Sequence, residues 1–145
     1  MRVKVKLPAL VLPALLLPGA CATPEISVQV PDSRPGDTLQ AAYFVGTWCN
    51  NRELTSSANS AAGHSALVNL GKVFWKFSEG GKWRESDTGW MYSMSGDWQL
   101  QPPNRLILDS TRAKPVIYEA GFKNSGIDLL LKDNAGQYLV LSRCE

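Results

Sequence analysis

Turn-forming residues recur at short intervals through most of this 145-residue chain. Glycine, proline and asparagine mark the segments 79–82, 95–97, 101–104, 123–126 and 133–136. Between them lie runs rich in leucine, aromatic and β-branched residues, at 72–77, 97–101, 105–110, 115–122, 127–132 and 137–143. Short strands at this spacing are typical of antiparallel sandwiches and barrels. The pattern predicts an all-β domain, an antiparallel up-and-down β-barrel of about eight short strands, with a β-sandwich as the alternative.

One stretch of the chain lacks strand character. Residues 55–66, TSSANSAAGHSA, are small and mostly polar. We expect a loop or a short helix there.

The N-terminus has the composition of a secretory signal peptide. Three basic residues occur among the first six, and an apolar run from Leu7 to Leu17 follows. That run is too short to cross a bilayer, which needs about 20 apolar residues. We interpret residues 1–20 as a signal peptide that is removed. Its removal leaves 12 of the 15 basic residues against 13 acidic ones, a formal net charge of −1. No basic stripe remains, so we expect no nucleic-acid partner.

Two cleavage sites are compatible with the end of this segment. Ala20-Cys21-Ala22 fits an ordinary signal peptidase that cuts after Ala22. Residues 17–21, LPGAC, instead resemble the lipobox of bacterial lipoproteins, in which the cysteine is acylated and becomes the first residue. Residue Ala22 is not the aspartate that retains enteric lipoproteins in the inner membrane. The resemblance therefore implies a lipid anchor on Cys21 at the periplasmic face of a bacterial outer membrane; the alternative is a soluble periplasmic or secreted protein.

The number of cysteines agrees with the lipobox. Three cysteines are present, and an odd number in an exported protein leaves one thiol to be explained. If Cys21 carries lipid, Cys49 and Cys144 remain as a pair in an oxidising compartment, where disulfides persist. We therefore predict a Cys49–Cys144 disulfide.

Residues 21–40 have the composition of a linker. Three prolines are mixed with polar residues and only a few apolar ones. We expect a flexible tether between the lipid and a single domain at 41–145. As an alternative, residues 26–30, ISVQV, add an edge strand to that domain.

The segment 44–51, FVGTWCNN, resembles the Gly-x-Trp opening of the lipocalin and calycin superfamily, carried here by Gly46, Thr47 and Trp48. The resemblance implies that Gly46 begins the first strand of an up-and-down barrel and that Trp48 plugs one end of it. It also implies that Arg143, at the end of the last strand, lies over Trp48.

One strand register satisfies both the disulfide and the Trp–Arg contact. A first strand that runs from Gly46 to Thr55 places Cys49 beside Cys144, within the roughly 7 Å between Cα atoms that a bridge allows. Direct pairing of the two cysteines makes Trp48 and Arg143 diagonal neighbours on the opposite face, because strand side chains alternate.

Residues that carry catalysis are sparse. His64 is the only histidine, and it lies in a polar segment where we interpret it as an exposed loop residue. One histidine and a bridged cysteine pair do not make an ordinary zinc or transition-metal site. The chain also lacks a nucleophile elbow and a phosphate-binding glycine loop. We expect no enzymatic activity, no cofactor and no metal.

Four tryptophans and a tyrosine in the middle of the chain are the candidate ligand-binding residues: Trp75, Trp83, Trp90, Tyr92 and Trp98. The interior of a small barrel holds either its own side chains or one small ligand, so these rings either fill the core or line a pocket. We expect a membrane-anchored, non-enzymatic binding module for a small apolar ligand or an envelope protein. The alternative is a periplasmic inhibitor of a lysozyme or protease, with residues 55–66 as its protruding loop.

Overall fold

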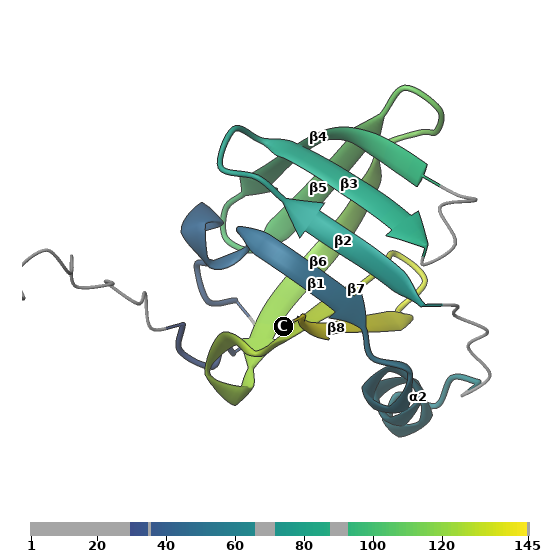
Figure 1. Ribbon diagram of the computed structural model, residues 1–145. Helices are drawn as coiled ribbons and strands as arrows, with labels where there is room; N and C mark the ends of the chain where they lie inside the picture. Colours follow the sequence, from purple (N-terminus) through teal and green to yellow (C-terminus); the bar gives the residue numbers. More distant parts are fainter. Residues whose placement is uncertain (1–29, 35, 66–71, 88–92, 145) are drawn as a thin grey trace, which may run out of the picture.

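The computed structural model, shown in Figure 1, describes residues 30–34, 36–65, 72–87 and 93–144. It is an antiparallel barrel of eight strands, closed in the order β1 to β8, which confirms the predicted fold class. The strands are β1 (Gly46–Asn50), β2 (Val73–Phe77), β3 (Lys82–Asp87), β4 (Ser93–Gln101), β5 (Arg105–Ser110), β6 (Val116–Lys123), β7 (Asp128–Lys132) and β8 (Tyr138–Arg143). The remaining elements are the 3-10 turns η2 (Ala41–Tyr43) and η3 (Asn124–Gly126) and the helix α2 (Arg52–Ala61). Within the described ranges, no helix has the length and apolar character needed to cross a membrane.

Alternate residues of the strands point into the barrel, as the two-residue period of a strand requires. Directly opposed pairs such as Trp48 with Trp75, and Trp98 with Leu108, lie on this inner face. The buried core consists mainly of Trp48, Trp75, Phe77, Trp83, Trp98, Leu106, Leu108, Phe122, Leu129, Leu131 and Leu141, together with Phe44 from the turn before β1.

The first strand is shorter than the sequence predicts. It ends at Asn50, and α2 begins at Arg52. Asn51 is the N-cap of this helix, because its side-chain oxygen accepts a hydrogen bond from the Leu54 N–H at 2.9 Å. Asparagine is among the preferred N-cap residues, so the extension of β1 to Thr55 was wrong. The polar stretch that follows takes the helical option of the two that were predicted.

Helix α2 covers an edge of β8 that β1 leaves unpaired; Figure 1 shows it beside the ends of these two strands. β1 pairs with only three residues of β8. Beyond them, Thr55 Oγ1 accepts from Val140 N–H at 2.9 Å and donates to Val140 C=O at 3.3 Å. Asn59 accepts from Tyr138 N–H at 2.8 Å and donates to Tyr138 C=O at 3.0 Å. The two helix side chains thus bond the strand as a ninth strand would.

The N-terminal segment covers the matching edge of β6. β5 pairs with β6 only as far as Glu119. Further on, Ser33 N–H donates to Phe122 C=O at 3.0 Å, and Phe122 N–H donates to Ser33 Oγ at 2.6 Å. Val30 and Leu39 are buried in the core cluster. The described part of the expected tether therefore packs on the barrel; most of the alternative edge strand at 26–30 lies outside the described residues.

Cys49 and Cys144 form the predicted disulfide, with Cα atoms 5.4 Å apart. The register differs from the expected one by two residues, since Trp48 pairs directly with Arg143 and Cys49 with Ser142. The bridge is therefore diagonal and the Trp–Arg pair is direct. β1 can take this register because it ends early, at Asn50. α2 bonds the edge of β8 at Tyr138 and Val140, so these residues need no partner strand.

Candidate functional site

Arg143 closes one end of the barrel. Its guanidinium carbon lies 3.9 Å from the centroid of the Trp48 ring, a cation–π contact. Nη1 donates to Val45 C=O and Nη2 to Tyr43 C=O, both at 2.7 Å. Burial lowers the pKa of Arg143. The contacts join the last strand to the turn that precedes the first, so Arg143 fastens this end of the barrel.

Gly46 and Trp48 complete this closure. Gly46 has a φ of +131°, and a Cβ on it would overlap Nη1 of Arg143. Both the backbone conformation and the lack of space therefore favour glycine. The Trp48 indole N–H donates to Phe44 C=O at 2.8 Å. The residues of the lipocalin-like motif thus lie together at one end of the barrel.

The described tryptophans of the candidate ligand-binding set lie in the core. Trp75, Trp83 and Trp98 are 5%, 6% and 7% exposed. Each indole N–H has an internal acceptor at 3.0–3.1 Å, which for Trp75 is a carboxylate oxygen of Glu85 and for the other two is a main-chain carbonyl. Rings satisfied in this way are packed as core residues. The other two members, Trp90 and Tyr92, lie outside the described residues.

Aromatic rings meet across the barrel interior. Trp75 on β2 and Tyr118 on β6 lie 6.3 Å apart between ring centroids, although strands four positions apart in a closed eight-stranded barrel face each other. Nearer the closed end, Trp48 lies 6.2 Å from Phe122. Side chains thus fill the interior at both levels.

Tyr118 is neutral in this packing. Burial, together with the negative charges of Glu85 and Asp133, raises the pKa of Tyr118 to about 12. The phenol stays protonated well above neutral pH and contributes its ring to the core.

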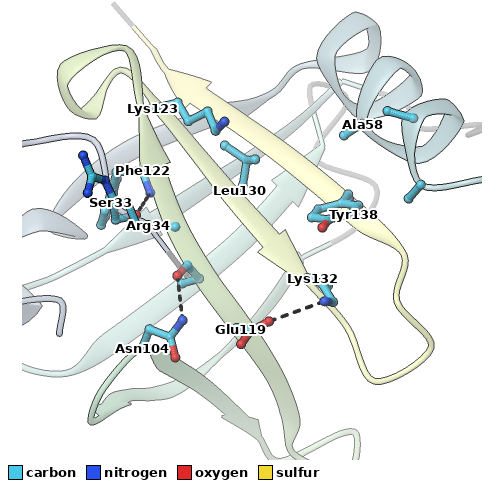
Figure 2. Close-up of a pocket in the computed structure, with 14 residues that line it drawn as sticks. Ser33, Arg34, Ala58, Asn104, Glu119, Phe122, Lys123, Leu130, Lys132 and Tyr138 are labelled. Atoms are coloured by element: carbon cyan, nitrogen blue, oxygen red, sulfur yellow. Dashed lines mark hydrogen bonds and ion pairs between the residues drawn. The ribbon is translucent and has the colours of Figure 1, made fainter. Parts of the chain in front are cut away.

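A groove lies on the outside of the barrel. It has a volume of about 480 Å³ and runs over the outer face of β6, β7 and β8, as Figure 2 shows. One wall is the N-terminal segment and the other is α2. The lining residues are Ser33, Arg34, Ala58, Ala61, Ala62, Asn104, Glu119, Ala120, Gly121, Phe122, Lys123, Leu130, Lys132 and Tyr138. Its walls are the same two elements that cover the edges of β6 and β8.

The groove was not predicted from the sequence. The one signal that could have indicated it is the spacing of Ala58, Ala61 and Ala62, which places three methyl groups on one face once the segment is recognised as a helix. The other wall comes from residues expected to be a free tether. The floor is formed by outward-facing residues of β6, β7 and β8. The strand prediction rested instead on apolar residues, most of which face inward.

Metal-binding groups do not gather in the described residues. No group of three or more His, Cys, Asp or Glu side chains there is arranged to hold a metal ion. His64, which we expected to be exposed, is half-buried at the end of the polar stretch. Its main-chain N–H donates to Asn59 C=O at 2.8 Å. Its ring lies against the turn at Gly136.

The fold and the groove define a small closed β-barrel with a filled interior and an external site. Searches of protein-family models, curated proteins and solved structures find no match to the chain.

Proposed function

We propose that the protein is a non-enzymatic binding module, held at the periplasmic face of a bacterial outer membrane by acyl chains on Cys21, and that it binds its ligand or partner outside the barrel. A lipocalin- or calycin-like ancestry belongs to the same proposal. It is supported by the closed barrel of eight strands and by the Gly46, Trp48 and Arg143 cluster.

The contact between Trp75 and Tyr118 carries the proposal. Because rings from opposite strands meet there, a ligand could enter the interior only by displacing packed aromatic side chains. The external groove needs no such displacement. Its volume of about 480 Å³ lies within the range of roughly 300–1,000 Å³ that is typical of small-molecule sites.

A lipid anchor on Cys21 would hold the groove near the membrane. Val30, which packs on Gly126 at the closed end, follows Cys21 by nine residues. Nine extended residues span at most about 30 Å. Ser33 and Arg34, only three and four residues beyond Val30, form one wall of the groove.

The inhibitor alternative gains no support from the described residues. A protruding polar loop was its expected feature. Thr55 and Asn59 are instead buried against β8, and the stretch is helical as far as Ala61.

The test is mass spectrometry of the mature protein purified from its own membrane, as wild type and as two variants. Ala61→Trp places a large side chain in the groove, and Ala113→Trp places the same side chain on the exposed β5–β6 connection. We expect an acylated Cys21 in all three, and a co-purifying molecule that Ala61→Trp loses and Ala113→Trp keeps. An unmodified N-terminus after Ala22 would remove the anchor, and retention of the molecule by Ala61→Trp would remove the groove.

A further inference from the structure

The groove combines an apolar floor, a cation at one end that forms no ion pair with the described residues, and edges whose described backbone groups are hydrogen-bonded. We propose that it binds a single-chain anionic amphiphile, whose alkyl chain lies along Leu130, Tyr138 and the alanines of α2 and whose head group lies at Lys123. This inference rests on the proposed function, since it names the ligand class of the same site.

The floor and one wall of the groove suit an alkyl chain. Leu130 and Tyr138 contribute apolar surface from β7 and β8, and Ala58 and Ala61 contribute methyl groups from α2. Gly121 lies on the floor and has no side chain, and a Cβ there would approach Ser33 Oγ of the wall to 3.2 Å. Each methylene that this surface removes from water contributes about fourfold to affinity.

The hydrogen-bonding groups of the groove's backbone are already occupied. Along β6, Ala120 is bonded by Asn104 and Phe122 by Ser33. Along β8, the helix bonds Tyr138 and Val140 as described above. A peptide would bring its own N–H and C=O groups into the groove and find no main-chain partners, which is costly. An alkyl chain brings none, so the site favours an amphiphile over a peptide.

The charges place the head group at one end. In Figure 2 the Lys123 side chain extends over the strands on the side of Leu130, while Lys132 reaches Glu119 at the other end. Lys132 and Glu119 neutralise each other at 3.6 Å. Lys123 forms no ion pair with any described residue. Its cross-strand neighbour Asp128 is buried and hydrogen-bonded to Asn124 and Ser142.

Arg34 adds a second positive charge on the wall formed by the N-terminal segment. Its side chain is exposed and extends away from the floor in Figure 2. It raises the local positive potential without fixing the head group. Lys123 is therefore the cation whose removal tests the proposal.

The experiment is isothermal titration calorimetry on the mature full-length chain carrying Cys21→Ser, which prevents acylation. Dodecanoate and dodecyltrimethylammonium, each below its micellar concentration, provide the same alkyl chain with opposite head-group charge. We expect one dodecanoate per chain and at least about tenfold weaker binding of the cation, because a charge-assisted contact is replaced by repulsion. Equal affinity for the two probes would overturn the proposal.

Two matched pairs of variants locate the ligand. Lys123→Gln should weaken dodecanoate binding about tenfold, whereas Lys76→Gln, on the outer face of β2, should leave it unchanged. Ala61→Trp should weaken it at least about tenfold by filling the groove, whereas Ala113→Trp should not. Thermal melts of all four variants verify folding. Unchanged binding in folded Lys123→Gln or in folded Ala61→Trp would overturn the assignment of head group or chain.

Vesicles containing an anionic phospholipid distinguish the binding of a monomeric ligand from docking on a membrane surface. Binding to vesicles without binding to dodecanoate would overturn the proposal in favour of membrane docking. If Ala61→Trp removes a co-purified protein from the membrane preparation but dodecanoate does not bind, the ligand class is wrong and the binding module stands. If Ala61→Trp changes neither the co-purified molecule nor the binding of dodecanoate, both the ligand class and the proposed function of the groove are wrong.

Discussion

At the scale of single residues, Arg143 links the last strand of the barrel to the first strand and to the turn before it. Its guanidinium is partly buried, yet both terminal nitrogens donate to carbonyls of the turn before β1, and its face lies on Trp48. A buried cation is tolerated when its donors are satisfied in this way. Arginine suits the position better than lysine, because its planar fork reaches two acceptors while it stacks on a ring.

Arg143→Met should therefore lower the free energy of unfolding by about 2–4 kcal/mol, since it removes two charge-assisted hydrogen bonds and leaves the carbonyls of Tyr43 and Val45 without donors. Urea denaturation followed by tryptophan fluorescence measures this loss. Arg105→Met, at an exposed position of β5, should cost less than about 0.5 kcal/mol. Equal losses in the two variants would show that the contacts of Arg143 contribute no specific stability.

Tyr118 predicts a pH dependence at the same scale. Its pKa is raised from 10.0 to about 12, so between these values the folded chain keeps a proton that the unfolded chain has lost. Folding stability should therefore fall as the pH rises from about 10 to about 12, and Tyr118→Phe should remove that part of the decline. Phenolate absorbance should show Tyr118 titrating earlier in Glu85→Gln, because a nearby negative charge is gone. An unchanged titration in Glu85→Gln would contradict this cause.

At the scale of elements, α2 acts as a substitute for a strand. Residues four apart on a helix are separated by about 6 Å along its axis, and residues two apart on a strand by about 6.6–6.8 Å. Thr55 and Asn59 therefore match the spacing of Val140 and Tyr138, which they bond. The exposed strand edge is thereby removed, and an open edge is a risk for aggregation.

Thr55→Val tests this substitution of a helix for a strand. The valine side chain has nearly the same shape but offers no acceptor to the buried Val140 N–H, so we expect a loss of about 1–3 kcal/mol in the free energy of unfolding. Hydrogen exchange should also become faster at Val140. Ser57→Ala, at an exposed position on the same helix, is the control and should change neither quantity. Unaltered exchange at Val140 in Thr55→Val would show that the hydroxyl does not protect this edge.

At the scale of the whole molecule, the first and last strands of the barrel are joined both by hydrogen bonds and by a disulfide. The Cys49–Cys144 bridge links residues separated by 95 positions. It lies on the outer face beside the pairing of β1 with β8, which is the shortest strand contact of the barrel. The covalent link thus lies where the hydrogen-bonded closure is weakest.

Removing this bridge should destabilise the protein by about 4–5 kcal/mol on the chain-entropy model for a loop of this length. The double variant Cys49→Ser/Cys144→Ser, compared with wild type by chemical denaturation, measures the loss. Wild type in reductant should behave as the double variant does. A thiol titration of the unfolded, unreduced mature protein should find neither cysteine free, and two reactive thiols would contradict the bridge.

Local patterns predicted the strands and the disulfide because the information for both is local or countable. Close turns between β-prone runs left few architectures for this length, and a leftover third cysteine made Cys49 and Cys144 the natural pair. The end of β1 was mispredicted because strand propensity was extended through Asn51, whose side chain instead begins a helix. The register then moved by two residues, since partners depend on where the strand stops.

The sequence by itself determined the all-β class and the bridge, because turn chemistry and residue counts require no knowledge of distant contacts. The closing pair of Trp48 and Arg143 was expected only from the resemblance of the Gly-x-Trp segment to the lipocalin and calycin superfamily. Only the tertiary structure decided that the tryptophans fill the interior, that a helix and an N-terminal segment cover two strand edges, and that the space between them is a groove. The physical reason is that packing across a barrel and over its outer face joins residues far apart in the chain, and no local pattern records which of them meet.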